Sequence, residues 1–241
     1  MSKRDPMPPI RHLVARSKRF FKQMLGRDLW IRPQVRVPTV FLGSEYGGYA
    51  IDDRGLNPDS IVYSFGLGED VSFDLAMIER YQTTVHAFDP TPRAIAWLRE
   101  QSLPGKFVFR PVGLADHDGA ALFAPPSRER HVSYSLARST PESSTGVVAQ
   151  VARLATLLGE NGHDRCDVLK MDVEGAEYQI LEDILDTETN VRQIVLEFHP
   201  EMIASGLKRT SNLLQRMNHA GYSIIAISPD GRNYSLRRAY Q

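Results

Sequence analysis

The ten residues from Ile61 to Asp70 read IVYSFGLGED. The first five are largely apolar and predict a buried strand. Gly66 and Gly68 predict a tight turn, and apolar residues at helical spacing after Asp70 predict a helix. A strand, a Gly-x-Gly turn and a helix are how a doubly wound sheet brings its backbone close to a nucleotide-like ligand. This stretch therefore predicts an α/β fold with a ligand site at the turn.

The alternation of strand and helix patterns continues along the rest of the chain. Further strands are expected at Thr84–Phe88, Phe107–Pro111, Val168–Met171, Gln193–Phe198, Ser223–Ile227 and Asn233–Arg237. Such alternation predicts a mainly parallel sheet covered by helices on both faces. The turn signal Pro229–Gly231 separates the last two strands, so we expect the sheet to end in an antiparallel hairpin.

Four other segments carry signals of their own. Thr91–Pro92 has the residue types of a helix N-terminus. The pattern of Val147–Gly159 fits both a helix and a strand. Residues 33–60 contain several prolines and glycines and are expected to be an irregular connecting segment. Pro125–Gly146 is rich in Ser, Pro and Arg, and a loop of this length is more often functional than idle, so we expect it to help determine specificity.

Two acidic residues follow the glycine turn, where a dinucleotide would place its pyrophosphate over the helix N-terminus. Glu69 and Asp70 would repel a diphosphate but suit a ligand that carries a sulfonium or ammonium group. The third glycine of the dinucleotide fingerprint is also missing. The turn therefore favours S-adenosylmethionine over a nicotinamide cofactor, with Asp70 among the residues that bind it.

Two further strand ends add candidate cofactor contacts. Asp89–Pro90 ends a strand ~20 residues beyond the turn, where such folds place the carboxylate that binds ribose. Capping the following helix is an alternative role for Asp89, although Thr91 suits that role better. Leu114 and Ala115 belong to a small-residue turn after the next strand, which would leave a slot for a flat base.

Chemistry-bearing side chains follow two later strands. Asp172 and Glu174 come directly after an apolar strand, and His199 ends the next one. Ligands of open α/β sheets bind at the carboxyl ends of strands, so we expect these three side chains to lie around the reacting group. Histidine is the residue type most readily used as a base near neutral pH. Helix capping and a structural ion pair are the alternative roles.

Lys170 lies inside the first of these strands, and Glu197 is its expected partner.

These motifs, in this order, resemble the FkbM family of S-adenosylmethionine-dependent methyltransferases over about residues 60 to 228. The most specific part is the run LKMDVEGAE at Leu169–Glu177, and the motifs FDP at Phe88–Pro90 and LEFH at Leu196–His199 support it. The resemblance implies a class I methyltransferase (Rossmann-like) sheet of seven strands with a reversed last strand. It also implies O-methylation, often of sugar hydroxyls in glycan or natural-product pathways.

We therefore expect an O-methyltransferase that uses S-adenosylmethionine, with Asp172, Glu174 and His199 around the acceptor oxygen and Asp172 also near the cofactor. The acceptor would be a small molecule or a glycan. The same three side chains are of types that bind divalent metals, but the prediction includes no metal. Two alternatives stay open at this point. One is a nicotinamide-dependent oxidoreductase on the same sheet, and the other is a non-catalytic scaffold recruited to a membrane.

Composition limits the remaining possibilities. The chain has 241 residues and one cysteine, Cys166, so it has no intramolecular disulfide and no multi-cysteine zinc site, and the cytoplasm is its expected location. No apolar run is long enough to span a bilayer.

The net charge of zero hides a contrast between residues 1–32, with nine basic and two acidic residues, and residues 33–241, with 20 basic and 27 acidic ones. The sequence thus divides into an arm (1–32), a connecting segment (33–60) and a methyltransferase domain (61–241).

The arm has the pattern of a basic amphipathic helix, with apolar residues from Ile10 to Leu25 at three- and four-residue steps. Such a helix can lie on an anionic membrane, which would place the protein peripherally at the inner membrane surface. It can also dock its apolar stripe, including Val14, Phe21 and Leu25, on the domain. Nucleic acid is not an expected partner, because we find no aromatic interleaving in the arm and the rest of the chain is acidic. The sequence does not determine the oligomeric state.

Overall fold

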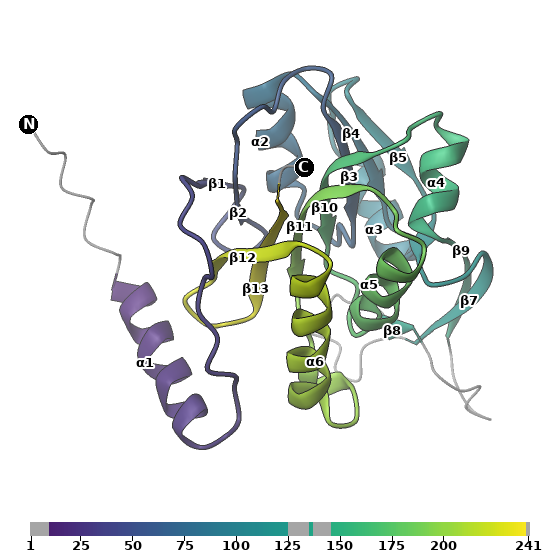
Figure 1. Cartoon of the computed structure of the whole chain (residues 1–241). Helices are drawn as coiled ribbons and strands as arrows, with labels where there is room; N and C mark the ends of the chain where they lie inside the picture. Colours follow the sequence, from purple (N-terminus) through teal and green to yellow (C-terminus); the bar gives the residue numbers. More distant parts are fainter. Residues whose placement is uncertain (1–9, 125–134, 137–145, 240–241) are drawn as a thin grey trace, which may run out of the picture.

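The computed structural model describes residues 10–124, 135–136 and 146–239, and its centre is a seven-stranded sheet (Figure 1). The strand order is β12-β13-β11-β10-β3-β4-β5. The strands are β3 (Ile61–Phe65), β4 (Thr84–Phe88), β5 (Phe107–Arg110), β10 (Cys166–Met171), β11 (Val191–Glu197), β12 (Tyr222–Ile227) and β13 (Asn233–Arg238). Neighbouring strands from β11 to β5 are parallel, whereas β13 runs antiparallel to both β11 and β12. This confirms the prediction of a mostly parallel sheet with a reversed last strand.

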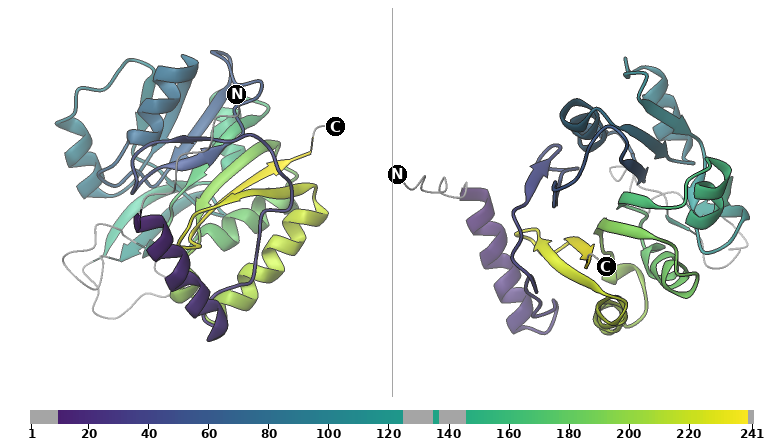
Figure 2. Two further views of the ribbon diagram at one scale, coloured as in Figure 1. Left: turned by 90° about the vertical axis from the view of Figure 1, so that its left-hand side faces the viewer. Right: turned by 45° about the horizontal axis from the view of Figure 1, so that its top comes forward.

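Helices cover both faces of this sheet (Figure 2). Helices α2 (Ser72–Tyr81) and α3 (Pro92–Arg99) lie on one face, and α4 (Leu154–Glu160), α5 (Glu177–Asp186) and α6 (Gly206–His219) lie on the other. A short 3-10 helix, η1 (Pro200–Met202), follows β11. Thr91 caps α3, because its side chain accepts a hydrogen bond from the Ala94 N–H, as its sequence predicts.

The two hydrophobic clusters follow the alternation of side chains along each strand. On the central strands β3 and β10, Val62 and Val168 face α2 and α3, whereas Tyr63 and Leu169 face α4, α5 and α6. All four side chains are fully buried. A strand that is buried on both faces has no polar face, which is why these strands read as nearly continuous apolar runs.

Two smaller sheets complete the fold. β6 (Gly113–Leu114), β7 (Gly119–Ala124), β8 (Ser135–Leu136) and β9 (Val147–Ala152) form a four-stranded sheet beside the cavity described below. The ambiguous segment Val147–Gly159 therefore contains both a strand, β9, and most of a helix, α4. Most of Pro125–Gly146 lies outside the described residues, so its expected part in specificity stays a prediction.

The connecting segment 33–60 is not irregular throughout, contrary to the sequence-based expectation. It contains an antiparallel hairpin of β1 (Val40–Leu42) and β2 (Tyr49–Ile51) that packs against α2. Asp52 follows the hairpin, is fully buried, and forms an ion pair with Arg237 on β13. Strands of three residues leave a weak period-2 signal, and the hairpin depends on burial against the rest of the domain.

The N-terminal arm contains helix α1 (Ile10–Met24), as predicted. The alternative in which its apolar stripe docks on the domain is wrong, because Val14 and the larger Phe21 and Leu25 are exposed, the last two by 65% and 67%. Among the described residues, no helix is both long and apolar enough to cross a membrane.

Candidate active site

A cavity of about 310 Å³ lies at the carboxyl ends of β3, β4 and β10. Ligands of open α/β sheets bind at this edge. Its wall includes Tyr46, Phe65, Gly66, Leu67, Gly68, Glu69, Asp70, Phe88, Asp89, Pro90, Thr91, Gly113, Leu114, Phe123, Asp172, Val173 and Glu174. Seven of the eight residues predicted to bind the cofactor therefore border one hollow.

The glycine turn needs glycine for two different reasons. Gly66 has a φ of +72°, and a Cβ at this position would lie 1.7 Å from the Asp172 carbonyl oxygen, so the end of β10 leaves no space for a side chain. Gly68 has a φ of +54° and open space where its Cβ would be. The turn can therefore present its backbone to the cavity with no side chain in the way.

Asp89 holds the turn in place. One of its carboxylate oxygens accepts hydrogen bonds from the N–H groups of Leu67 (2.9 Å) and Gly68 (3.0 Å). The other accepts from the N–H (2.9 Å) and the hydroxyl (2.6 Å) of Thr91. Four donors meet the usual capacity of a carboxylate. Asp89 thus ties the end of β4 to the glycine turn, and its contact with a ribose stays a prediction.

The two acids after the turn have different surroundings. Glu69 is paired with Arg93 through two hydrogen bonds of 2.8 and 3.0 Å. Asp70 accepts hydrogen bonds from the Ser44 hydroxyl (2.6 Å) and from the Ser72 N–H at the start of α2 (2.8 Å). Burial alone would raise the pKa of Asp70, but these hydrogen bonds outweigh it and hold the pKa below its usual range. Asp70 is therefore a fixed negative charge in the cavity wall.

One residue predicted to contact the cofactor does not line the cavity, and two residues that were not predicted do. Ala115 does not belong to it, because this side chain packs against Phe123 and Val151 in the small sheet behind the cavity. Phe123 itself borders the cavity from β7, and Tyr46 borders it from the β1–β2 turn. Tyr46 is 83% exposed. Neither residue belongs to a motif at a strand end, so local sequence contains no signal that would have found them.

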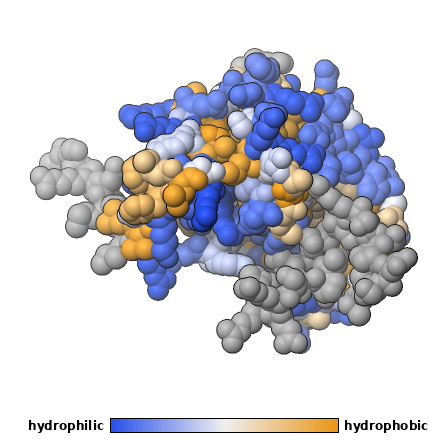
Figure 3. All heavy atoms as spheres, turned by 90° about the horizontal axis from the view of Figure 1, so that it is seen from below, coloured by the Kyte–Doolittle hydropathy of each residue, from blue (hydrophilic) through white to orange (hydrophobic). Residues whose placement is uncertain are grey.

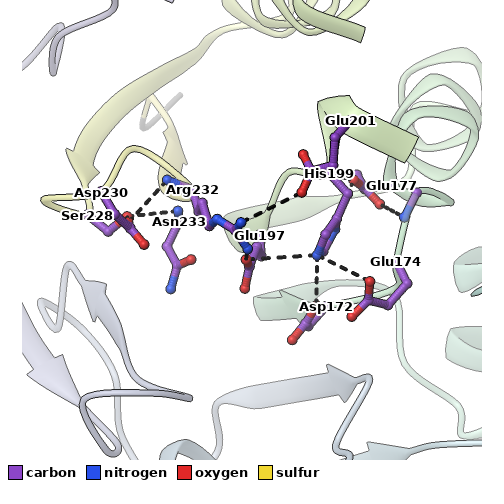
Figure 4. Close-up of polar contacts among 11 residues, drawn as sticks. Asp172, Glu174, Glu177, Glu197, His199, Glu201, Ser228, Asp230, Arg232 and Asn233 are labelled. Carbon is purple, nitrogen blue, oxygen red and sulfur yellow. Dashed lines mark hydrogen bonds and ion pairs between the residues drawn. The ribbon is translucent and has the colours of Figure 1, made fainter. Parts of the chain in front are cut away.

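Beside the cavity, acidic side chains surround His199 (Figure 4). His199 Nε2 lies 3.5 Å from a Glu174 oxygen and 3.8 Å from oxygens of both Asp172 and Glu197. On the other side of the ring, Nδ1 lies 3.3 Å from the buried Glu177. The same Glu177 carboxylate accepts hydrogen bonds of 2.7 Å from the N–H groups of Gly175 and His199, which fixes the position of the histidine.

This arrangement decides how the cluster is charged. Burial alone would lower the pKa of His199, but Glu177, Glu174 and Asp172 outweigh it and raise the pKa to about 9. Burial raises the pKa of Asp172, and burial together with Asp172 raises that of Glu197. At neutral pH the imidazole therefore carries a proton that the carboxylates stabilise. The sequence-based prediction of a neutral-pH base at His199 did not include these neighbours.

The same side chains can hold a divalent cation. One ligand atom from each of Asp172, Glu174 and His199 lies within 4.8 Å of the others. Two carboxylate oxygens and an imidazole nitrogen are a usual donor set for such ions. Glu177 would then orient the histidine from behind, as carboxylates commonly do for metal-bound histidines.

Lys170 does not pair with Glu197, contrary to the sequence-based prediction. It is only 3% exposed, and its ammonium group donates a hydrogen bond of 2.7 Å to the Gly66 carbonyl oxygen. The strand register explains the difference, because Lys170 lies opposite Val195 and Glu197 lies two residues further along β11. Lys170 thus holds the glycine turn through its hydrogen bond to the Gly66 carbonyl oxygen.

The residues that line the cavity are of types that fit S-adenosylmethionine. Bare backbone at Gly68 opens toward the cavity, Asp70 places a negative charge there, and Phe88, Leu114 and Phe123 offer apolar surface for a base. The strand order, the reversed strand and a cavity at the glycine turn together define a class I, Rossmann-like methyltransferase fold.

Comparison with known proteins gives the family. Residues 56–224 match the model of the methyltransferase FkbM domain, so the chain belongs to the FkbM methyltransferase family. This confirms the resemblance found in the sequence.

Several named relatives share this region. The chain is 30% identical over 141 residues to the rat probable methyltransferase-like protein 24, and 30% identical over 146 residues to the human one. These matches cover 57% and 59% of this chain but only 32% and 33% of those relatives. It is 26% identical over 175 residues to 31-O-demethyl-FK506 methyltransferase FkbM of Streptomyces tacrolimicus, which covers 60% of this chain and 67% of that protein.

Solved structures give a more distant likeness. A Methanococcus jannaschii fibrillarin pre-rRNA processing protein aligns with a TM-score of 0.43 at 10% identity, over 77% of this chain and 69% of the other. The structure of a fibrillarin/Nop5p complex aligns with a TM-score of 0.44 at 10% identity, over 77% of this chain and 75% of the other.

Proposed function

We propose that this protein is an S-adenosylmethionine-dependent O-methyltransferase whose acceptor is a hydroxyl of a sugar, a glycan-related molecule or a natural product. The observation that carries the proposal is the cavity wall, in which the glycine turn and the acids Asp172 and Glu174 border the same hollow. Membership of the FkbM family supports methyl transfer. The name of the Streptomyces relative, a 31-O-demethyl-FK506 methyltransferase, supports oxygen as the acceptor atom.

The residues divide into two groups with different tasks. Bound S-adenosylmethionine would supply a methyl group on a sulfonium, which is already electrophilic. Asp70, Asp89, Pro90 and the backbone of Gly66 and Gly68 form the side of the cavity that would hold the cofactor, and Leu114 offers a surface for its base. The protein's remaining task is to align the acceptor oxygen and to accept its proton.

Asp172 and Glu174 are best placed for that second task. Both border the cavity, whereas His199 lies behind them with a side chain that is only 7% exposed. Because burial raises the pKa of Asp172, this carboxylate is a stronger base than an exposed aspartate. The protonated His199 would steady the negative charge of the cluster at neutral pH. Above its pKa of about 9, it could itself receive a proton.

A labelled-methyl transfer assay tests the proposal. Cell extract fractionated into glycans, lipids and small molecules is offered with labelled S-adenosylmethionine, and transfer to a hydroxyl-bearing acceptor is the expected result. Glu174→Ala or His199→Ala should lower turnover by about 10²-fold or more while cofactor affinity changes little, as expected for loss of a proton acceptor or of the group that supports it.

The exposed Glu79 on α2 gives a matched control, since Glu79→Ala removes a carboxylate far from the cluster and should leave turnover unchanged. Absence of cofactor binding by calorimetry would contradict the proposed function. Full turnover in both cluster variants would exclude Glu174 and His199 as the proton acceptor.

A further inference from the structure

Helix α1 carries its apolar side chains on the face turned away from the domain. Figure 3 shows them in orange tones at the left of the view. We call this surface the outer stripe, and it consists of Leu13, Val14, Phe20, Phe21, Met24 and Leu25, each 48–67% exposed. At about 100° per residue, the five members within α1 span an arc of roughly 120°. An exposed apolar surface of this kind marks an interaction site.

The opposite face of α1 is polar and holds the helix to its surroundings. Arg19 pairs with Asp28, both with side chains less than 15% exposed, and the Gln23 side chain donates a hydrogen bond of 2.7 Å to the Leu29 carbonyl oxygen. Arg19 also packs against Gly231 in the β12–β13 turn. These contacts fix the orientation of α1 on the domain. The outer stripe therefore faces solvent because of the way the helix is attached.

Basic side chains lie on both sides of the outer stripe. Lys18 and Lys22 are exposed along one edge and Arg16 along the other, and the exposed Arg27 follows the helix. Arg11 is exposed too, although it pairs with Glu45. An apolar face between basic edges is the arrangement of helices that lie in the interface of an anionic membrane.

We propose that α1 binds an anionic lipid surface, with the outer stripe in the boundary between headgroups and acyl chains and the basic edges on the headgroups. This inference is independent of the proposed methyl transfer. Charge complementarity identifies the occupant, because a second copy of the chain on the same stripe would bring two sets of basic edges together. A bilayer that contains anionic lipid neutralises them.

Vesicle sedimentation of the full chain tests the proposal. The protein should sediment with phosphatidylcholine vesicles that contain about one third phosphatidylserine, and at least about tenfold more weakly with phosphatidylcholine alone. Raising salt from about 0.1 M to about 0.5 M should lower binding steeply, because the screening length falls below its physiological value of about 8 Å.

Two pairs of variants locate the binding surface. Phe21→Glu combined with Met24→Glu should lower vesicle binding by at least about tenfold, whereas Val148→Glu, which changes an exposed apolar residue on β9, should not. Lys18→Glu combined with Lys22→Glu should likewise lower it by at least about tenfold, whereas Arg99→Glu on α3, near the opposite edge of the sheet, should not. All of these side chains are exposed, so melting temperatures should stay close to that of the parent protein.

Trp30 provides a second readout at the site itself. It is exposed, lies 5.8 Å from Phe20 between ring centroids, and is one of two tryptophans in the chain. In a Trp97→Phe variant, anionic vesicles should shift the emission of Trp30 to shorter wavelength.

Three results would overturn the proposal. The first is no sedimentation with anionic vesicles at low salt. The second is binding that the α1 variants do not weaken. The third is a soluble dimer that Phe21→Glu with Met24→Glu dissociates, since a second copy would then occupy the outer stripe.

Discussion

Asp89 holds the fold around the glycine turn, and we also expect it to contact the ligand. Its carboxylate receives four hydrogen bonds that join the glycine turn to the start of α3. We predict that Asp89→Ala weakens binding of S-adenosylmethionine by about 1.5–3 kcal/mol, through loss of charge-assisted hydrogen bonds and of the turn's geometry. Calorimetry measures the change, with Asp116→Ala, at an exposed acid, as control. Equal affinity in parent and Asp89→Ala would remove Asp89 from the site.

His199 makes stability depend on pH. Its pKa is about 9 in the folded protein and 6.5 as the ordinary value, so the folded state binds the proton more tightly than the unfolded chain. The resulting stabilisation is complete below about pH 6.5 and is lost as pH rises through about 9. We predict that the melting temperature falls over this window and falls less in His199→Asn, which cannot titrate.

Two of the other histidines titrate below this window. Burial lowers the pKa of His86 to about 4 and also lowers that of His163, so both titrate at lower pH. A melting temperature with the same pH dependence in parent and His199→Asn would show that His199 is not the titrating group.

At the scale of elements, the glycine turn between β3 and α2 depends on the neighbouring strand. Gly66→Ala and Gly68→Ala share the strain of a left-handed residue, which costs roughly 1–2 kcal/mol, but only the first would also push against the Asp172 backbone. Such overpacking typically adds about 1–3 kcal/mol. We predict a clearly larger drop in melting temperature for Gly66→Ala than for Gly68→Ala in thermal unfolding. Similar drops would mean that β10 does not restrict the turn.

At the scale of the whole molecule, the arm and the catalytic fold should be separable. The six residues of the outer stripe are all 48% or more exposed, whereas Ile31 packs against the main core and Gln34 exchanges hydrogen bonds with Ile224 on β12. We predict that deletion of residues 1–27 lowers the melting temperature by no more than a few degrees and leaves cofactor affinity unchanged. A large loss of stability would show that α1 is a structural part of the domain.

The sequence alone determined the central sheet and the place of the site. Strands such as β3 and β10 are buried on both faces, so their apolar runs are visible locally, and Gly66, Asp89 and Asp172 follow strands whose carboxyl ends must share one edge of a parallel sheet. Asp172, Glu174 and His199 could be grouped for the same reason. The periodicity of α1 likewise showed that the helix has an apolar face and a basic face.

Only the tertiary structure decided which groups these residues meet. Strand register places Lys170 next to the Gly66 carbonyl oxygen, and Glu197 lies beside His199 instead. A register difference of two residues between neighbouring strands leaves no trace in the local sequence. The pKa of His199 depends on Glu177, which α5 brings from another part of the fold. An amphipathic pattern shows that α1 has two faces but not which face meets the domain, since that choice depends on partners such as Asp28, Leu29 and Gly231, which lie beyond the helix itself.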